Sequence, residues 1–225
     1  MAYGSVITVH GCNCFRTHIP KKDGSATKMI KAVVFDFDGT LTMPGAIDFA
    51  GIRKALGCPQ SQPILEFLEA LEGSPEHARA CAVLDEFEMR AAARATPNVG
   101  AEQTIRDLQE TGVPMSIVTR NCRRAVDRSL ENFTELSADD FQVILTRDDS
   151  IRPKPDSESV RHAAIAMGVP VVQILCVGDY LFDIELAKNA GCLSAYLAPD
   201  GDEPALEPDY LVEKLDEIPA IVSRG

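Results

Sequence analysis

The chain has 225 residues, of which 45% are hydrophobic and 25% charged, and its formal net charge is −12. This length and composition are typical of a globular protein with one large domain, or with a core and a modest insertion. The negative charge argues against a nucleic-acid partner, which needs a basic surface, and no apolar run approaches the roughly 20 residues of a membrane span.

Residues 1–28 differ from the rest of the chain, and we interpret them as an N-terminal extension. His10, Cys12, Cys14 and His18 suggest a zinc site, but their spacing does not match the usual zinc-finger patterns, so we favour a tail or an edge strand. The extension lacks the features of a secretory signal. Since the seven cysteines are odd in number and widely spread, we expect a reducing, cytoplasmic environment.

An apolar run at residues 32–35 predicts a buried strand of a parallel sheet, and two carboxylates follow it, Asp36 and Asp38. They would point the same way if the strand continued. Gly39 allows the chain to leave the strand and approach a ligand closely. In such a pair one carboxylate can attack while the other moves a proton, and both attract a hard cation such as Mg²⁺.

The segment Asp-Phe-Asp-Gly-Thr-Leu-Thr at residues 36–42 resembles the first motif of the haloacid dehalogenase (HAD) superfamily. Most members of that superfamily are Mg²⁺-dependent phosphatases. The resemblance therefore implies a Mg²⁺ cofactor and a small phosphorylated metabolite as partner. It covers nearly all of the chain beyond the extension.

The strand pattern stops after residue 41, and helical periodicity follows at 48–56, 62–71 and 75–95. Glycine and proline punctuate these helices, so residues 42–96 form a small all-helical insertion. At this point of the chain it resembles the cap of HAD-like proteins, which covers the catalytic face and excludes water.

From residue 97 onward, strands and helices alternate, which predicts parallel βαβ units with helices on both faces of the sheet. We expect helices at 101–111, 121–133, 156–167 and 181–190, strands at 113–118, 141–145, 171–177, 193–197 and 210–212, and a final helix. The predicted fold is therefore an α/β, doubly wound parallel sheet. Residues 29–41 and 97–225 would form a HAD-like Rossmannoid core.

Three further motifs at strand ends match the family in order. Thr119 follows a strand, where its hydroxyl can donate to a phosphoryl oxygen near a helix start. Lys154 lies between two prolines, which stiffen its loop, and can neutralise a nucleophile and a transferring phosphoryl group. Asp179 and Asp183 lie at i and i+4, so their carboxylates meet on one face.

The resemblance implies a role for each motif residue. Asp36 would attack phosphorus and form an aspartyl-phosphate, and Asp38 would serve as general acid and then base. The implied catalytic residues are Asp36, Asp38, Thr119 and Lys154, and the implied metal ligands are Asp36, the backbone carbonyl of Asp38, Asp179 and Asp183.

Residues 97–101 resemble the cap-to-core junction of phosphoglycolate-phosphatase-like members, and a small cap favours small phosphomonoesters. Candidate substrate residues are Arg120, Asn121, Arg90 and Arg94, and further cap cations are Arg53, His77 and Arg79. A sugar-phosphate mutase of the same superfamily and a non-catalytic HAD-like binding protein are the alternatives. We expect a monomer or a homodimer.

Overall fold

The computed structural model describes residues 29–199, 201 and 204–224, so the N-terminal extension and its four candidate zinc ligands lie outside the described residues. The described chain contains one six-stranded sheet in the order β3-β2-β1-β4-β5-β6, and every neighbouring pair is parallel. The strands are β1 (Ala32–Phe35), β2 (Met115–Val118), β3 (Val143–Leu145), β4 (Ile174–Gly178), β5 (Leu193–Leu197) and β6 (Tyr210–Val212).

The centre of the sheet is β1, which pairs with β2 on one side and β4 on the other. Val34 lies beside Ser116 of β2 and Cys176 of β4. Because the three strands are parallel, their carboxyl ends reach the same edge of the sheet. The strand order also reverses direction beside β1, and open α/β sheets bind ligands in the crevice at such a point.

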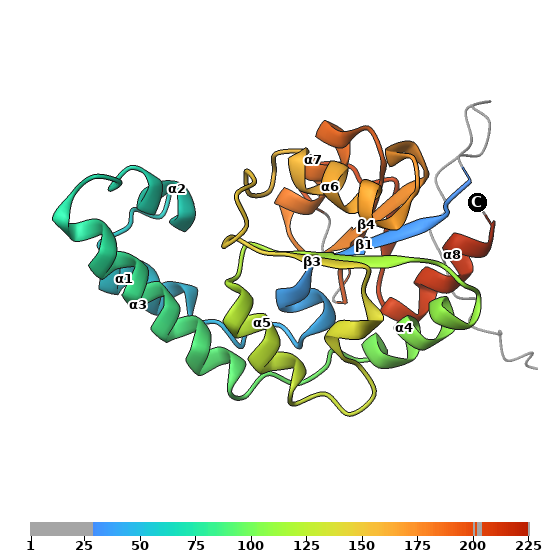
Figure 1. Ribbon diagram of the computed structural model, residues 1–225, viewed down its shortest axis with the longest axis horizontal. Coiled ribbons are helices and arrows are strands. Elements are labelled where there is room, and N and C mark those ends of the chain that lie inside the picture. Colours follow the sequence, from blue (N-terminus) through green and yellow to red (C-terminus); the bar gives the residue numbers. More distant parts are fainter. Residues whose placement is uncertain (1–28, 200, 202–203, 225) are drawn as a thin grey trace, which may run out of the picture.

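Helices cover both faces of the sheet, which confirms the predicted doubly wound α/β fold (Figure 1). Val33 and Phe35 pack toward α4, α5 and α8, whereas Ala32 and Val34 pack toward α6 and α7. This alternation is why β1 is apolar at every position: both of its faces are buried. The core helices are α4 (Ala101–Glu110), α5 (Arg123–Leu130), α6 (Glu158–Met167), α7 (Leu181–Ala190) and α8 (Ile218–Arg224).

Several bounds differ by a few residues from the sequence expectations, and two of the differences change the local structure. The strand expected from residue 171 begins at Ile174, because Val171–Gln173 forms a 3₁₀ turn in which the Gln173 amide donates to the Pro170 carbonyl (2.9 Å). The first strand ends at Phe35, and Phe37–Leu41 forms a kinked helical turn. Asp36 and Asp38 are therefore not related by strand alternation, because the turn rotates the second carboxylate away from the first.

The insertion between β1 and α4 contains three helices, α1 (Phe49–Leu56), α2 (Ile64–Glu69) and α3 (Pro75–Ala92). They lie beside the core in Figure 1 and share a small apolar cluster that includes Ile52, Leu68 and Leu84. The two connecting segments run side by side, because Thr42 pairs with Pro97 and the Met43 amide donates to the Thr96 carbonyl (2.9 Å). None of the helices in the described part of the chain has the length and apolar character that a membrane crossing needs.

The long helix α3 fastens the insertion to the core. Its last turns pack on α5, where Ala92 meets Cys122 and Ala125. Arg147, in the loop after β3, donates to both carboxylate oxygens of Glu88 (2.6 and 2.5 Å) and also pairs with Asp85. The side chains of Arg147 and Glu88 are only 14% and 6% exposed, so this ion pair is shielded from water.

Replacing Arg147 should therefore destabilise the protein. Arg147→Met leaves the buried Glu88 carboxylate without its cation, and loss of one partner of a buried pair costs about 3–5 kcal/mol. Chemical denaturation should show this loss, and the double variant Arg147→Met/Glu88→Leu should recover much of it because no charge is then stranded. A single variant as stable as the wild-type protein would contradict this account of the pair.

Candidate active site

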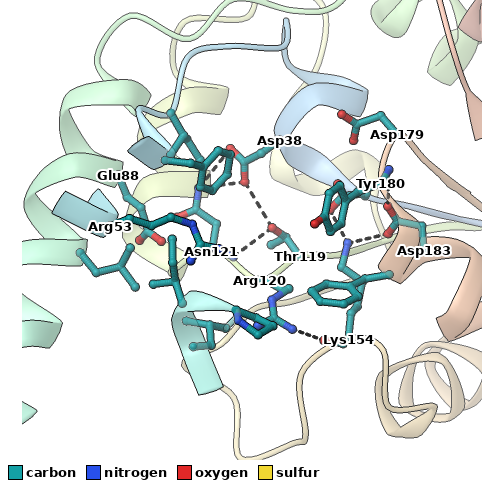
Figure 2. A pocket seen from close by; sticks show the side chains of 18 of the residues that line it. Asp38, Arg53, Glu88, Thr119, Arg120, Asn121, Lys154, Asp179, Tyr180 and Asp183 are labelled. Atoms are coloured by element: carbon teal, nitrogen blue, oxygen red, sulfur yellow. Dashed lines mark hydrogen bonds and ion pairs between the residues drawn. The ribbon is translucent and has the colours of Figure 1, made fainter. Parts of the chain in front are cut away.

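A cavity of about 590 Å³ lies between the carboxyl edge of the sheet and the helical insertion. The motif residues line one wall, and residues of α1, α2, α3 and their loops line the other (Figure 2). Its core side includes Asp36, Asp38, Thr119, Arg120, Asn121, Lys154, Asp179 and Asp183, and its insertion side includes Phe49, Arg53, Ile64, Leu65, Leu84 and Glu88. The insertion thus faces the residues that the sequence motifs single out.

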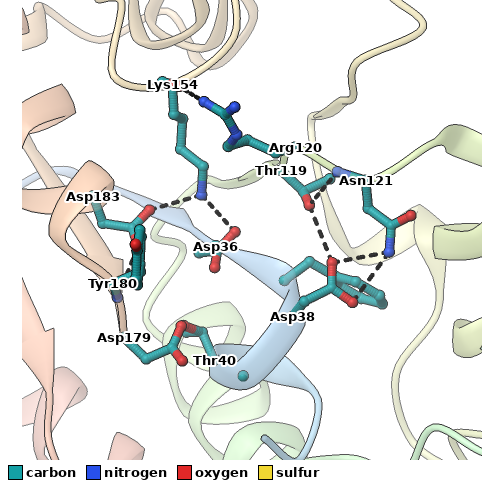
Figure 3. Close-up of polar contacts among 12 residues, drawn as sticks. Asp36, Asp38, Thr40, Thr119, Arg120, Asn121, Lys154, Asp179, Tyr180 and Asp183 are labelled. Atoms are coloured by element: carbon teal, nitrogen blue, oxygen red, sulfur yellow. Dashed lines mark hydrogen bonds and ion pairs between the residues drawn. The ribbon is translucent and has the colours of Figure 1, made fainter. Parts of the chain in front are cut away.

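Lys154 links two carboxylates at the centre of the site. Its Nζ lies 2.5 Å from Asp36 Oδ1 and 2.7 Å from Asp183 Oδ1, and all three residues are buried. Burial opposes the charge of Lys154, but the charges of Asp183 and Asp36 outweigh it and raise the pKa of the ammonium above its usual value. Lys154 therefore stays charged and offsets the repulsion between the two carboxylates. Figure 3 shows its contacts with both of them.

Asp38 is held apart from that cluster by neutral donors. Asn121 Nδ2 donates to both of its carboxylate oxygens (3.1 and 2.9 Å), and Thr119 Oγ1 donates to Oδ2 (3.4 Å). Desolvation and the negative charge of Asp36 raise the pKa of Asp38 to about 7, although the Asn121 hydrogen bond opposes this change. A carboxyl group that titrates near neutral pH can both give and take a proton there.

Asp179 directly follows β4 and leans over the turn that follows β1. Thr40 Oγ1 donates to its Oδ1 (3.1 Å). Gly39 has φ +88°, and a Cβ there would lie 2.2 Å from Asp179 Oδ2. Only glycine allows this close approach, which gives a physical reason for the glycine in the motif.

Three acidic side chains could hold a metal ion. Carboxylate oxygens of Asp36, Asp179 and Asp183 all lie within 4.8 Å of one another. Desolvation and the neighbouring charges of Asp36 and Asp183 raise the pKa of Asp179 to about 7, and desolvation is also the main reason that the pKa of Asp183 rises to about 6. One ammonium, that of Lys154, faces these three carboxylates, so the oxygen-only set can keep a net negative charge, which suits a hard divalent cation such as Mg²⁺.

A second acidic group, formed by Asp85, Glu88 and Cys122, has comparable spacing. Arg147 already donates to both carboxylates of that group. Its negative charge is therefore offset within the protein, and we assign it no metal.

Arg120 and Asn121 lie in the cavity wall, but both have protein partners. Asn121 binds Asp38, as described above. Arg120 donates to Glu66 Oε2 of α2 (2.6 Å) and to the Lys154 carbonyl, and its guanidinium lies 4.8 Å from the centre of the Phe182 ring. Arg120 thus joins the insertion, the Lys154 loop and α7 across one side of the cavity.

Arg90 and Arg94 are not among the residues that line the cavity. Arg90 pairs with Glu86 one turn away on the exposed face of α3, and Arg94 Nη2 donates to the Ala46 carbonyl (3.3 Å). Helical periodicity shows that α3 is amphipathic, but it does not show which of its faces meets the core. This geometry gives the two arginines no contact with the motif residues.

Sequence reasoning did not single out Thr40 or Glu88. Thr40 lies inside the first motif, and its contact with Asp179 could only emerge once β1 and β4 were paired. The sequence pattern could have pointed to Glu88, because this charged residue interrupts the buried apolar face of α3 that includes Ala80, Leu84 and Ala91. A charged residue at helical spacing on a buried face needs a partner, and Arg147 is that partner.

Comparisons with known proteins identify the family of the chain. The sequence model of the family described as Haloacid dehalogenase-like hydrolase matches residues 42–197. An uncharacterized hydrolase of Saccharomyces cerevisiae, YOR131C, is 32% identical over 172 residues, which cover 76% of this chain and 78% of the yeast protein. Pyrophosphatase PpaX of Bacillus velezensis is 30% identical over 212 residues, which cover 85% of this chain and 95% of that protein.

Solved structures share the architecture. A predicted phosphoglycolate phosphatase from Haemophilus somnus superposes with a TM-score of 0.65 at 19% identity, covering 87% of this chain and 99% of that one. CbbY from Rhodobacter sphaeroides, in complex with phosphate, has a TM-score of 0.63 at 22% identity, covering 84% of this chain and 96% of that one. At these identities the structures show a common fold.

The raised pKa values predict how stability depends on pH without metal. The pKa values of Asp38, Asp179 and Asp183, about 7, 7 and 6, lie above their ordinary value of 3.8. Between about pH 4 and 7 the folded state therefore binds more protons than the unfolded state, so stability falls as pH rises. In EDTA, the midpoint temperature of thermal unfolding should therefore be several degrees higher at pH 5.5 than at pH 8. Each kcal/mol of stability shifts that temperature by about 2–4 °C in a protein of this size.

Asp38→Asn should reduce this pH dependence, because it removes one titrating group. Asp139→Asn, at an exposed position of the 3₁₀ turn Ala138–Asp140, should leave it intact. A midpoint temperature that rises from pH 5.5 to pH 8 would show that the three carboxyl groups do not dominate the pH dependence of stability.

Proposed function

This chain belongs to the haloacid dehalogenase-like hydrolases and is a phosphoric monoester hydrolase, and we propose that it uses Mg²⁺ to hydrolyse a small phosphomonoester through an aspartyl-phosphate on Asp36. Relatives named N-acetylmuramic acid 6-phosphate phosphatase and phosphoglycolate phosphatase support phosphate-ester chemistry. The observation that carries the proposal is the placement of Asp36 and Asp38 in one cavity with different surroundings. Asp36 contacts a cation, whereas Asp38 contacts neutral donors.

The surroundings of Asp36 suit a nucleophile. The hydrogen bond from Lys154 occupies Oδ1, so the proposal assigns attack on phosphorus to Oδ2. Attack forms a bond between a carboxylate oxygen of Asp36 and phosphorus as the ester oxygen leaves. Lys154 also supplies positive charge close to the transferring group, which lowers the cost of bringing two anions together.

The surroundings of Asp38 suit the acid and base steps. With a pKa of about 7, a large fraction of Asp38 is protonated at neutral pH and can donate its proton to the leaving alkoxide. The resulting carboxylate can then take a proton from the water that attacks the aspartyl-phosphate, which releases phosphate and restores Asp36. Asn121 and Thr119 hold the Asp38 side chain in place for both transfers.

The acidic set fits the proposed metal. Asp36, Asp179 and Asp183 would hold Mg²⁺, and the bound ion would offset negative charge between the nucleophile and the phosphoryl group. Thr40 orients Asp179, and the Tyr180 amide donates to Asp183 Oδ2 (3.2 Å), so both carboxylates are positioned by the protein itself.

Removing the nucleophile should abolish turnover. Asp36→Asn keeps the shape of the side chain but cannot form the acyl phosphate, so kcat should fall by about 10³-fold or more. The measurement is hydrolysis of para-nitrophenyl phosphate with Mg²⁺, and Asp139→Asn serves as the matched surface control. Near-normal turnover by a folded Asp36→Asn protein would refute the covalent scheme.

Metal removal should have the same effect and be reversible. Dialysis against EDTA should abolish hydrolysis and added Mg²⁺ should restore it, whereas Ca²⁺ should inhibit because its larger, looser coordination shell spoils the attack geometry. Calorimetric titration of Mg²⁺ should show one site that Asp179→Asn weakens. Full activity in EDTA would exclude this metal site.

A further inference from the structure

The wall of the cavity that faces the motif residues contains a cation with a distinct environment, Arg53 of α1. The sequence analysis named four other cations of the insertion, the candidate substrate residues Arg90 and Arg94 and the further cap cations His77 and Arg79, and none of these is among the cavity-lining residues. Figure 2 shows Arg53 and Glu88 on one side of the pocket and Lys154 and Asp183 on the opposite side. Arg53 therefore lies where the part of a substrate remote from the phosphoryl group would reach.

Backbone groups hold the Arg53 side chain in position. Its Nη1 donates to the carbonyls of Pro59 (2.6 Å) and Gln62 (2.7 Å) and lies 3.4 Å from Cys58 Sγ. All three contacts use the same nitrogen, and a guanidinium carries further N–H groups on Nε and Nη2. In the described part of the chain, these two nitrogens have no hydrogen-bond acceptor within the protein. Arg53 is thus oriented without using up its donors.

The charge of Arg53 is also uncompensated, in contrast to the other charged residues around it. Lys154 pairs with Asp36 and Asp183, and Arg120 pairs with Glu66. Glu88, the carboxylate of the same wall, pairs with Arg147. No carboxylate of the described residues forms an ion pair with Arg53. Carbonyl oxygens are neutral acceptors, so they orient the Arg53 guanidinium but do not neutralise its positive charge.

We propose that Arg53 is the specificity-determining residue of this site and binds a second anionic group on the leaving part of the substrate. The substrate class is then a phosphomonoester that also carries a carboxylate or a second phosphate. A planar guanidinium with donors on two nitrogens matches either oxyanion. This inference rests on the proposed phosphatase function, because that function places the transferring phosphoryl group at Asp36 and the leaving group toward the insertion.

Matched pairs of substrates test the proposal. Phosphoglycerate is compared with glycerol phosphate for the carboxylate, and a hexose bisphosphate is compared with the hexose monophosphate for the second phosphate. Para-nitrophenyl phosphate reports the chemical step alone. In at least one pair, the wild-type enzyme should favour the member with two anionic groups by about 10-fold or more in kcat/KM, the size expected of a charge-assisted hydrogen bond. The pair that shows the preference identifies which anion is bound.

The variant Arg53→Met should remove this preference mainly through KM, and hydrolysis of para-nitrophenyl phosphate should stay within about twofold. Arg53→Lys should retain part of the preference, because it keeps the charge but loses the planar fork. Arg79→Met is the matched control, since Arg79 is exposed on the same insertion and does not line the cavity. Its substrate preference should equal that of the wild-type enzyme.

Three results would overturn the proposal: a wild-type preference, in both pairs, for the member with only one anionic group; a fall in kcat/KM for Arg53→Met that is equal on all substrates; and a loss of preference in Arg79→Met that matches the loss in Arg53→Met. If Arg53→Met lowers kcat/KM equally on all substrates and also lowers the midpoint temperature of unfolding, Arg53 only supports the loop at Pro59 and Gln62. Calorimetric titration of phosphoglycerate and glycerol phosphate into the Asp36→Asn protein, with and without Arg53→Met, separates this question from catalysis. If turnover is absent but phosphoglycerate binds and Arg53→Met weakens it, the anion site stands and the phosphatase proposal fails.

Discussion

The attraction between the Lys154 ammonium and the carboxylates of Asp36 and Asp183 is the interaction on which the site depends. Three buried charges would be costly to take out of water one by one, and together they are tolerated because opposite charges lie 2.5 and 2.7 Å apart. Such a cluster requires a rigid frame, since a small displacement would strand a buried charge. The central strands β1 and β4 provide that frame, with residues that are buried on both faces.

The same requirement explains where glycine occurs around the cluster. A Cβ at Gly39 would collide with Asp179, and a Cβ at Gly178 would lie 2.1 Å from Asp183 Cγ. Each acidic side chain therefore folds back over a backbone that has no side chain of its own. Close packing of carboxylates against the chain excludes water from between them, and this desolvation is what raises their pKa values.

Ion pairs connect the insertion to the core on two sides, and they differ in how far they are buried. On the α3 side, the buried pair of Arg147 and Glu88 adds to apolar packing between α3 and α5. On the α2 side, Glu66 meets Arg120 in a more exposed pair, with side chains 35% and 18% exposed. Any opening of the cavity is therefore expected to separate α2 from the core first, since the α2 contact is less buried and water can replace it more readily.

The sequence alone determined the α/β core and the motif residues, because continuous apolar runs, helical periodicity and glycine or proline punctuation are local properties of a chain. It placed Asp36, Thr119 and Asp179 after strands, and parallel pairing then brings strand ends together. Tertiary structure decided which arginine meets the cavity: Arg53 lines it, whereas Arg90 does not. The reason is that periodicity defines the faces of a helix, while the orientation of a helix toward a site depends on contacts between residues distant in sequence, such as Arg147 with Glu88.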